Sequence, residues 1–162
     1  MKGDLLASGS ADESIQIWNM ASGLKVAEFK HDDCVWCVEF HENWLISSSW
    51  DKSTRIWDVE NQKLVHQLDH SDWCYNFDIS PNKLMLAVAT DSGVVIWDLK
   101  KVTKIKEFKL GWCSDVRFNH AGDKIIVGLF DGEVYKIDLI YDSEDGKTIA
   151  GINKSLSQAK IN

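Results

Sequence analysis

The chain has 162 residues and a mass of 18.4 kDa, with 44% hydrophobic and 27% charged residues, which is enough for one ordinary hydrophobic core. Eighteen Lys and Arg residues against 25 Asp and Glu give a formal net charge of −7, which repels phosphate backbones and disfavours direct nucleic-acid binding. The sequence has neither an apolar run of membrane-spanning length nor the layout of a secretory signal. We therefore expect a cytoplasmic or nuclear protein with no membrane partner, whose cysteines are reduced.

Four segments of the chain share one pattern with a period of about 40 residues. In each segment, an apolar stretch leads to small or turn-forming residues around an Asp, and alternating apolar residues follow. The aligned acidic residues are Asp12, Asp51, Asp91 and Asp131. The aligned residues six positions later are Trp18, Trp57, Trp97 and Ile137. This regular spacing indicates a structural repeat.

Each repeat predicts four β-strands. Residues 7–19 predict a two-stranded hairpin with its turn at the Asp, and the apolar stretch 24–29 predicts a third strand. Residues 34–40 predict the first strand of the next repeat, and the same order then recurs over 46–58, 63–68, 74–80, 87–99, 102–108, 113–119 and 126–138. The spacing from Val35 to Val38 to Phe40 breaks strict alternation once. This break predicts a β-bulge that turns Cys34 and Trp36 outward.

The predicted strands divide the chain into five parts: a partial repeat over 1–20, repeats over 21–59 and 60–99, a degenerate repeat over 100–139, and an outer strand with a polar tail over 140–162. The polar stretch 153–162 has no clear period, so we expect it to be weakly helical or loose. The expected fold class is all-β.

The segment KHDDCVWCVEFHENWLISSSWDKSTRIWD (30–58) resembles the WD40 repeat family, whose units carry a His, spaced apolar residues, a small-residue stretch before an Asp, and a closing Trp-Asp. The resemblance extends from about residue 4 to residue 139. It implies a β-propeller, in which four-stranded sheets form blades around a channel. We expect an arc of three four-stranded blades plus three strands of a further blade, as in the C-terminal part of a longer protein. Because propellers have about 4 to 8 blades, we expect missing N-terminal blades or another chain to complete the ring.

The resemblance also implies a buried hydrogen-bond network of His31, Ser47, Asp51 and Trp57, with a structural rather than a catalytic role. The next repeat has Ala in place of the Ser, so its network is only partial. The last repeat keeps the Asp alone, and we expect Val127 and Ile137 to replace the network by apolar packing.

Family members commonly bind partners at one rim of the ring, through the loop before the first strand, the bulge in that strand and the residue before the turn Asp. The aromatic residues at these positions are predicted to bind partners: Trp36, Trp50, Trp73, Tyr75, Trp112 and Phe130. The other rim positions are Ala11, Cys34, Thr90 and Ser114. The alternative is that these rings pack between blades.

The sequence favours neither a metal site nor catalysis. Cys34 and Cys37 are three apart in a predicted strand, which directs them to opposite faces, and no second CxxC completes a zinc site. Cys74 and Cys113 align with Val35, so we expect them in the core. Motifs for hydrolysis or phosphate binding are missing from the sequence, so we expect no enzyme activity and no cofactor.

The expected function is therefore a non-catalytic scaffold that binds protein or peptide partners. Two alternatives stay open. The first is the substrate-recognition part of an F-box/WD-type ubiquitin ligase adaptor, and the second is a subunit of an RNA-processing or chromatin complex.

Overall fold

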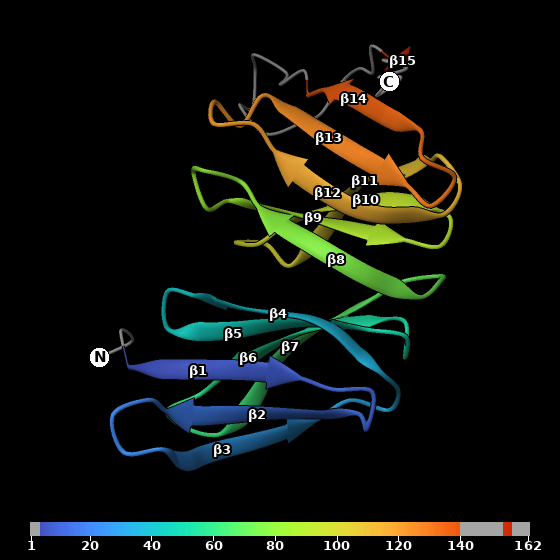
Figure 1. The fold of residues 1–162 in the computed structure, drawn as a ribbon. Coiled ribbons are helices and arrows are strands. Elements are labelled where there is room, and N and C mark those ends of the chain that lie inside the picture. The colour runs from blue at the N-terminus through green and yellow to red at the C-terminus, as the bar shows by residue number, and fades with distance from the viewer. Residues whose placement is uncertain (1–3, 140–153, 157–162) are drawn as a thin grey trace. The chain divides into compact units, whose positions relative to one another are not determined.

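The computed structural model describes residues 4–139 and 154–156, which form strands and turns (Figure 1). This confirms the all-β expectation. Within these described residues, fifteen strands form one three-stranded and three four-stranded sheets, all antiparallel, so the predicted set of three four-stranded blades plus three strands is also confirmed. Within the described ranges there is no helix with the length and apolar character needed to cross a membrane.

The chain divides into two compact units, Met1–Cys74 and Tyr75–Asn162. The first unit contains two sheets in which strands follow one another in chain order. One sheet is formed by β1 (Leu5–Gly9), β2 (Ser14–Asn19) and β3 (Leu24–Lys30). The other is formed by β4 (Val35–His41), β5 (Trp44–Ser49), β6 (Ser53–Asp58) and β7 (Lys63–Asp69).

The second unit also contains two sheets, again ordered by sequence. One is formed by β8 (Cys74–Ile79), β9 (Met85–Thr90), β10 (Gly93–Asp98) and β11 (Thr103–Lys109). The other is formed by β12 (Cys113–Phe118), β13 (Lys124–Leu129), β14 (Val134–Asp138) and β15 (Lys154–Leu156).

Strand β15 lies within 140–162, the range of the predicted outer strand, and also within 153–162, the stretch expected to be weakly helical or loose. It pairs antiparallel with β14, placing Leu156 opposite Tyr135, so the expectation of a helical or loose stretch is wrong for residues 154–156. The reason is that the edge of β14 offers backbone partners to any extended segment, whatever its side-chain period. The rest of that stretch lies outside the described residues.

Each unit buries its core between its two sheets. In the first unit, the alternating apolar residues of β2 and β3, such as Ile15, Ile17 and Phe29, pack against Val35 and Leu45 of the neighbouring sheet. In the second unit, Val94 and Ile96 pack against Val116, Ile125 and Val127. Cys74 and Cys113 are fully buried. Neither sheet could bury its apolar face alone, so each needs its neighbour.

Two kinds of bulge recur with the period of the repeat. The inner strands β4 and β12 shift register at Trp36 and at Ser114. The outer strands β3, β7 and β11 each skip one residue opposite the repeat Trp, at Val26, Val65 and Ile105. The inner bulge follows the irregular spacing of the sequence, and the outer one was not predicted.

Candidate functional site

A continuous hydrogen-bond chain crosses the sheet of β4 to β7. The Trp57 indole N–H donates to Ser47 Oγ at 2.8 Å, and Ser47 Oγ lies 2.7 Å from His31 Nε2. His31 Nδ1 lies 2.7 Å from Asp51 Oδ2. Because a carboxylate only accepts and an indole only donates, Nδ1 of the neutral imidazole donates to Asp51, and its Nε2 accepts a hydrogen bond from the Ser47 hydroxyl. The structure thus brings together the four residues that the resemblance to WD40 repeats implied.

Asp51 ties this chain to the loops around it. Its Oδ1 accepts hydrogen bonds from the Ser53 amide at 2.9 Å and the Ser53 hydroxyl at 2.7 Å, and its Oδ2 accepts from the Asp32 amide at 3.1 Å. Burial alone would raise the pKa of Asp51, but the hydrogen bonds from His31, Ser53 and Asp32 together hold that pKa well below its usual range. The carboxylate is therefore a fixed anion that anchors the turn.

Arg55 is a further member of this group that the sequence analysis missed. It is 12% exposed, pairs with Asp32 and lies 3.1 Å from Asp51 Oδ2. Its Nη1 also donates to the Lys30 carbonyl at 2.9 Å. The other three repeats have Gln, Val or Tyr at the aligned position, so the repeat pattern gave no signal for this residue.

The other repeats replace parts of the network. In the next repeat, His70 Nε2 lies 3.1 Å from Thr54 Oγ1, and Asp91 accepts a hydrogen bond from the Tyr75 hydroxyl at 3.3 Å. In the last repeat, Asp131 Oδ1 accepts from the Glu133 amide at 3.0 Å, while Val127 and Ile137 are fully buried. Apolar packing thus occupies the place of the lost polar residues.

Three tryptophans form a cluster at one end of the first unit. Trp50 lies 5.0 Å from Trp36 and 5.1 Å from Trp73, measured between ring centroids. Trp36 is 52% exposed and Trp73 is 43% exposed, while Trp50 between them is half-buried. We call Trp36, Trp50 and Trp73 the tryptophan cluster. They come from the bulge of β4, the β5–β6 loop and the β7–β8 loop.

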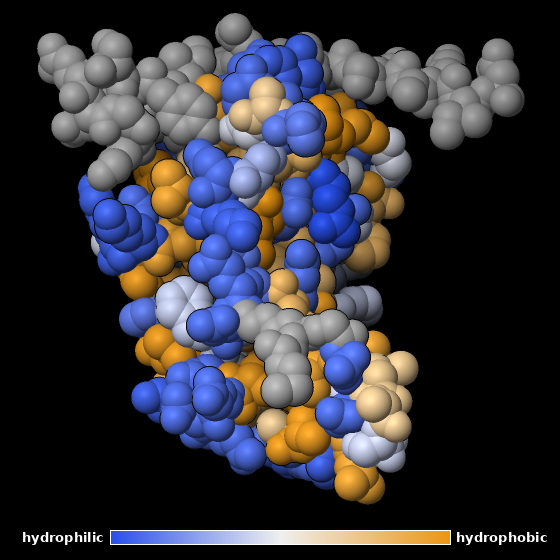
Figure 2. Space-filling view, turned by 90° about the vertical axis from the view of Figure 1, so that its left-hand side faces the viewer, coloured by the Kyte–Doolittle hydropathy of each residue, from blue (hydrophilic) through white to orange (hydrophobic). Residues whose placement is uncertain are grey.

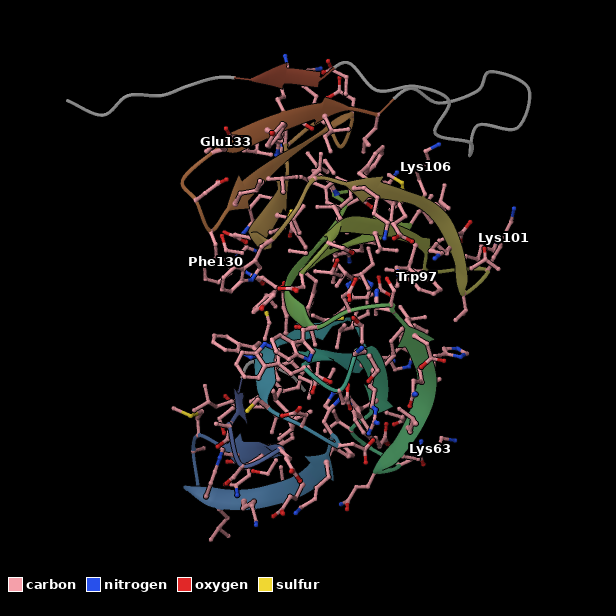
Figure 3. The ribbon with its side chains drawn as sticks, turned by 90° about the vertical axis from the view of Figure 1, so that its right-hand side faces the viewer. Lys63, Trp97, Lys101, Lys106, Phe130 and Glu133 are labelled. Atoms are coloured by element: carbon pink, nitrogen blue, oxygen red, sulfur yellow. The ribbon has the colours of Figure 1, made fainter. Side chains whose placement is uncertain are left out.

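The second unit has its own aromatic group. Trp112 and Phe130 stack with centroids 3.8 Å apart and are 47% and 50% exposed. Phe130 and Glu133 lie on one side of this unit, away from Trp97 and Lys101 (Figure 3). Tyr75 contacts both exposed rings but is only 4% exposed. The Tyr75 ring is covered by Trp112 and Phe130, and its hydroxyl donates to Asp91. This burial leaves little of Tyr75 for direct contact with a partner.

The loops that carry or adjoin the tryptophan cluster are hydrogen-bonded to one another. We call loops 10–13, 31–34, 50–52 and 70–73 the first rim. The Val35 amide donates to the Ser10 carbonyl at 3.0 Å, and the Trp50 amide donates to the Cys34 carbonyl at 3.0 Å. The Cys34 thiol lies 3.5 Å from the Ala11 carbonyl, and burial raises its pKa. The first rim is therefore one connected surface.

The remaining rim positions are less open. Thr90 is buried, and its hydroxyl donates to the Gly93 carbonyl at 3.1 Å. Ser114 donates to the Gly128 carbonyl at 3.1 Å. Among the residues that the structure describes, there is no group of three or more His, Cys, Asp or Glu side chains that could hold a metal ion.

Comparison with protein families explains the repeat. A family model described as WD domain, G-beta repeat, matches residues 2–19, 23–58 and 62–98, which is more than half of the chain. The chain belongs to the WD40 repeat family. The matches end at Asn19, Asp58 and Asp98, directly after the repeat tryptophans. A comparison with curated proteins finds no match.

The WD40 pattern also accounts for these end residues. Asp58 Oδ1 accepts from the Asn61 amide at 2.9 Å, and Asp98 Oδ1 accepts from the amides of Lys100 and Lys101, both at 2.8 Å. Asn19 does the same for the Ala21 amide at 3.0 Å. The residue after each Trp thus closes the next turn. WD40 repeats indicate a protein-interaction scaffold, and WD40 domains are generally non-catalytic.

Proposed function

We propose that this WD40 chain binds protein or peptide partners through the exposed aromatic residues of its rim. The observation that carries this proposal is the tryptophan cluster, in which two large rings remain about half exposed although each contacts Trp50. Trp residues are enriched at the centres of protein interfaces because they lose much apolar surface to water for little side-chain entropy. Trp112 and Phe130 would serve the second unit in the same way.

The opposite end of the sheets supplies a comparison surface. It also carries exposed apolar side chains, including Met20 at 60% and Leu24 at 66%. Figure 2, which faces this end, shows hydrophobic residues interspersed with hydrophilic ones. Exposed apolar area alone therefore does not distinguish the rim; the contact of several aromatic rings does.

The test is partner capture with four forms of the chain: wild type, Trp36→Ala/Trp73→Ala, Trp112→Ala/Phe130→Ala, and the control Met20→Ala/Leu24→Ala. We expect partners retained by the wild type and the control to be lost by at least one rim variant. A photo-crosslinking residue at position 36 should label these partners, and one at position 24 should not. Equal capture of partners by all four forms would show that the rim residues do not take part in binding.

The proposal includes completion of the ring by further blades. The sheet of β1 to β3 has three strands among the described residues, whereas the other sheets have four, which supports an additional inner strand. Sedimentation velocity tests whether a second copy of the chain supplies this strand. The sedimenting species would then have a mass well above the 18.4 kDa of one chain.

A further inference from the structure

We propose that the tryptophan cluster binds a cationic peptide segment, with Arg or Lys side chains against its exposed rings and carboxylates of the first rim around them. This inference rests on the proposed function and specifies the chemistry of the partner.

The geometry of the rings favours a flat or compact cation. Trp50 contacts Trp36 and Trp73 at about equal centroid distances, 5.0 and 5.1 Å. The two outer rings keep 52% and 43% of their surface accessible. Trp is the best aromatic partner for a guanidinium or ammonium group, and such a contact contributes about 0.5–1 kcal/mol at an exposed site.

The charges of the first rim are unbalanced. Its loops carry six carboxylates, Asp12, Glu13, Asp32, Asp33, Asp51 and Asp72, against three cations in or beside them, Lys30, Lys52 and Arg55. Arg55 already pairs with both Asp32 and Asp51. The other four carboxylates of these loops thus outnumber the two lysines in or beside them. Hydrogen bonds from Ser14 and Ser10 also lower the pKa of Asp12, which keeps it ionised.

Acidic residues lie in the same loops as the rings or next to them in the chain. Asp33 accepts a hydrogen bond from the Cys34 amide at 2.7 Å, and the Cys34 carbonyl in turn accepts from the Trp50 amide. Asp72 directly precedes Trp73, and Lys52 Nζ donates to the neighbouring Ser71 carbonyl at 3.3 Å. The aromatic and acidic groups thus belong to one preorganised surface, which lowers the cost of ordering it on binding.

The test uses labelled peptides and the full 162-residue chain. Fluorescence anisotropy measures binding of (Arg-Gly)6, (Lys-Gly)6, (Gln-Gly)6 and (Glu-Gly)6 at low and at physiological salt. We expect the two cationic peptides to bind, the neutral one to bind at least about threefold more weakly, and the anionic one not to bind. Added salt should weaken cationic binding.

Variants then locate the binding. Trp36→Ala should weaken the Arg peptide about two- to fivefold, with Trp36→Phe between it and the wild type. Asp72→Asn should weaken it by up to about fivefold. Glu60→Gln is the matched control, because it removes the same charge from the exposed β6–β7 turn at the other end of the sheet, and it should bind as the wild type does. Circular dichroism verifies the fold of each variant.

Three results would overturn the inference: equal binding of the Gln and Arg peptides, equal weakening by Asp72→Asn and Glu60→Gln, or no binding of any peptide. If the Gln and Arg peptides bind equally and Trp36→Ala weakens both, the preference for a cationic peptide is contradicted. Binding of partners at the rim is then still supported. If no peptide binds, the preference for a cationic peptide is also contradicted. The partner-capture experiment tests the proposed rim function independently of this result.

Discussion

The Ser47 hydroxyl connects two ring nitrogens, Trp57 Nε1 and His31 Nε2, and its residue is fully buried. We expect Ser47→Ala to lower the free energy of unfolding by about 2–3 kcal/mol, because both buried ring groups lose this bond at once. Urea denaturation measures the difference. The exposed Ser71→Ala is the control and should stay within about 0.5 kcal/mol of the wild type. A similarly small effect at Ser47 would show that the network contributes little.

Asp51 should couple stability to acid pH. Because its pKa is lower in the folded state than the ordinary value of 3.8, its stabilising effect is fully present above about pH 4 and is lost as the pH falls further. We expect the wild type to lose more unfolding free energy than Asp51→Asn between about pH 4 and pH 2. Chemical denaturation at several pH values tests this. Parallel profiles for the two proteins would contradict it.

The sequence could indicate the network but not its surroundings. The resemblance to WD40 repeats implies the set of His31, Ser47, Asp51 and Trp57, which is complete in one repeat and partial in the others. Arg55 is present in one repeat alone, and its role depends on Asp32 and the Lys30 carbonyl, which only the folded loops bring close. The burial of Tyr75 likewise depends on ring contacts that no periodic pattern encodes.

At the scale of elements, the turns before β3, β7 and β11 each contain one left-handed residue. The aligned residues are Gly23 at φ 70°, Gln62 at φ 51° and Val102 at φ 56°. Val is unfavourable there, because its β-branched side chain clashes with the backbone at positive φ. We expect Val102→Gly to raise the unfolding free energy by about 1 kcal/mol, as measured by urea denaturation. A loss of stability would show that Val102 packing outweighs the strain.

The reciprocal change isolates the backbone cause. A Cβ at Gly23 would meet no atom within 4 Å, so a side chain there has space and only the backbone angle opposes it. Gly23→Val should lower the unfolding free energy by about 1–3 kcal/mol. Gly23→Asn is the control and should cost less, since Asn tolerates this conformation. Equal losses for Val and Asn would contradict the explanation by β-branching.

Elements differ in how far the sequence determines them. The hairpins follow from alternation and Asp turns, so their existence was predictable. The outer bulges at Val26, Val65 and Ile105 were not, because stretches such as LKVAEF alternate imperfectly at their start and leave the register open. Strand β15 forms through backbone pairing with β14, which leaves little trace in side-chain order.

At the scale of the molecule, a repeat protein is stabilised mainly by contacts between neighbouring sheets. The division into two compact units, Met1–Cys74 and Tyr75–Asn162, agrees with this view. A change that disturbs one inter-sheet contact should therefore act first within its own unit. The N-terminal sheet offers such a contact at Gly9, where β1 lies against β4.

We expect Gly9→Ala to destabilise the first unit by about 1–3 kcal/mol. A Cβ at Gly9 would lie 2.7 Å from Val35 Cγ1 and 3.2 Å from Val38 Cγ1. The Val35 side chain is β-branched and buried, so it can move little to relieve this contact. Hydrogen exchange should speed up in β1 to β7 and change less in β9 to β14, while the exposed Ser8→Ala on the same strand should leave both unchanged. If coupling acts only between neighbouring sheets, the effect stays within the sheets that pack on Gly9. An equal rise in the hydrogen-exchange rate along the whole chain would contradict this expectation and would mean that the two units unfold cooperatively.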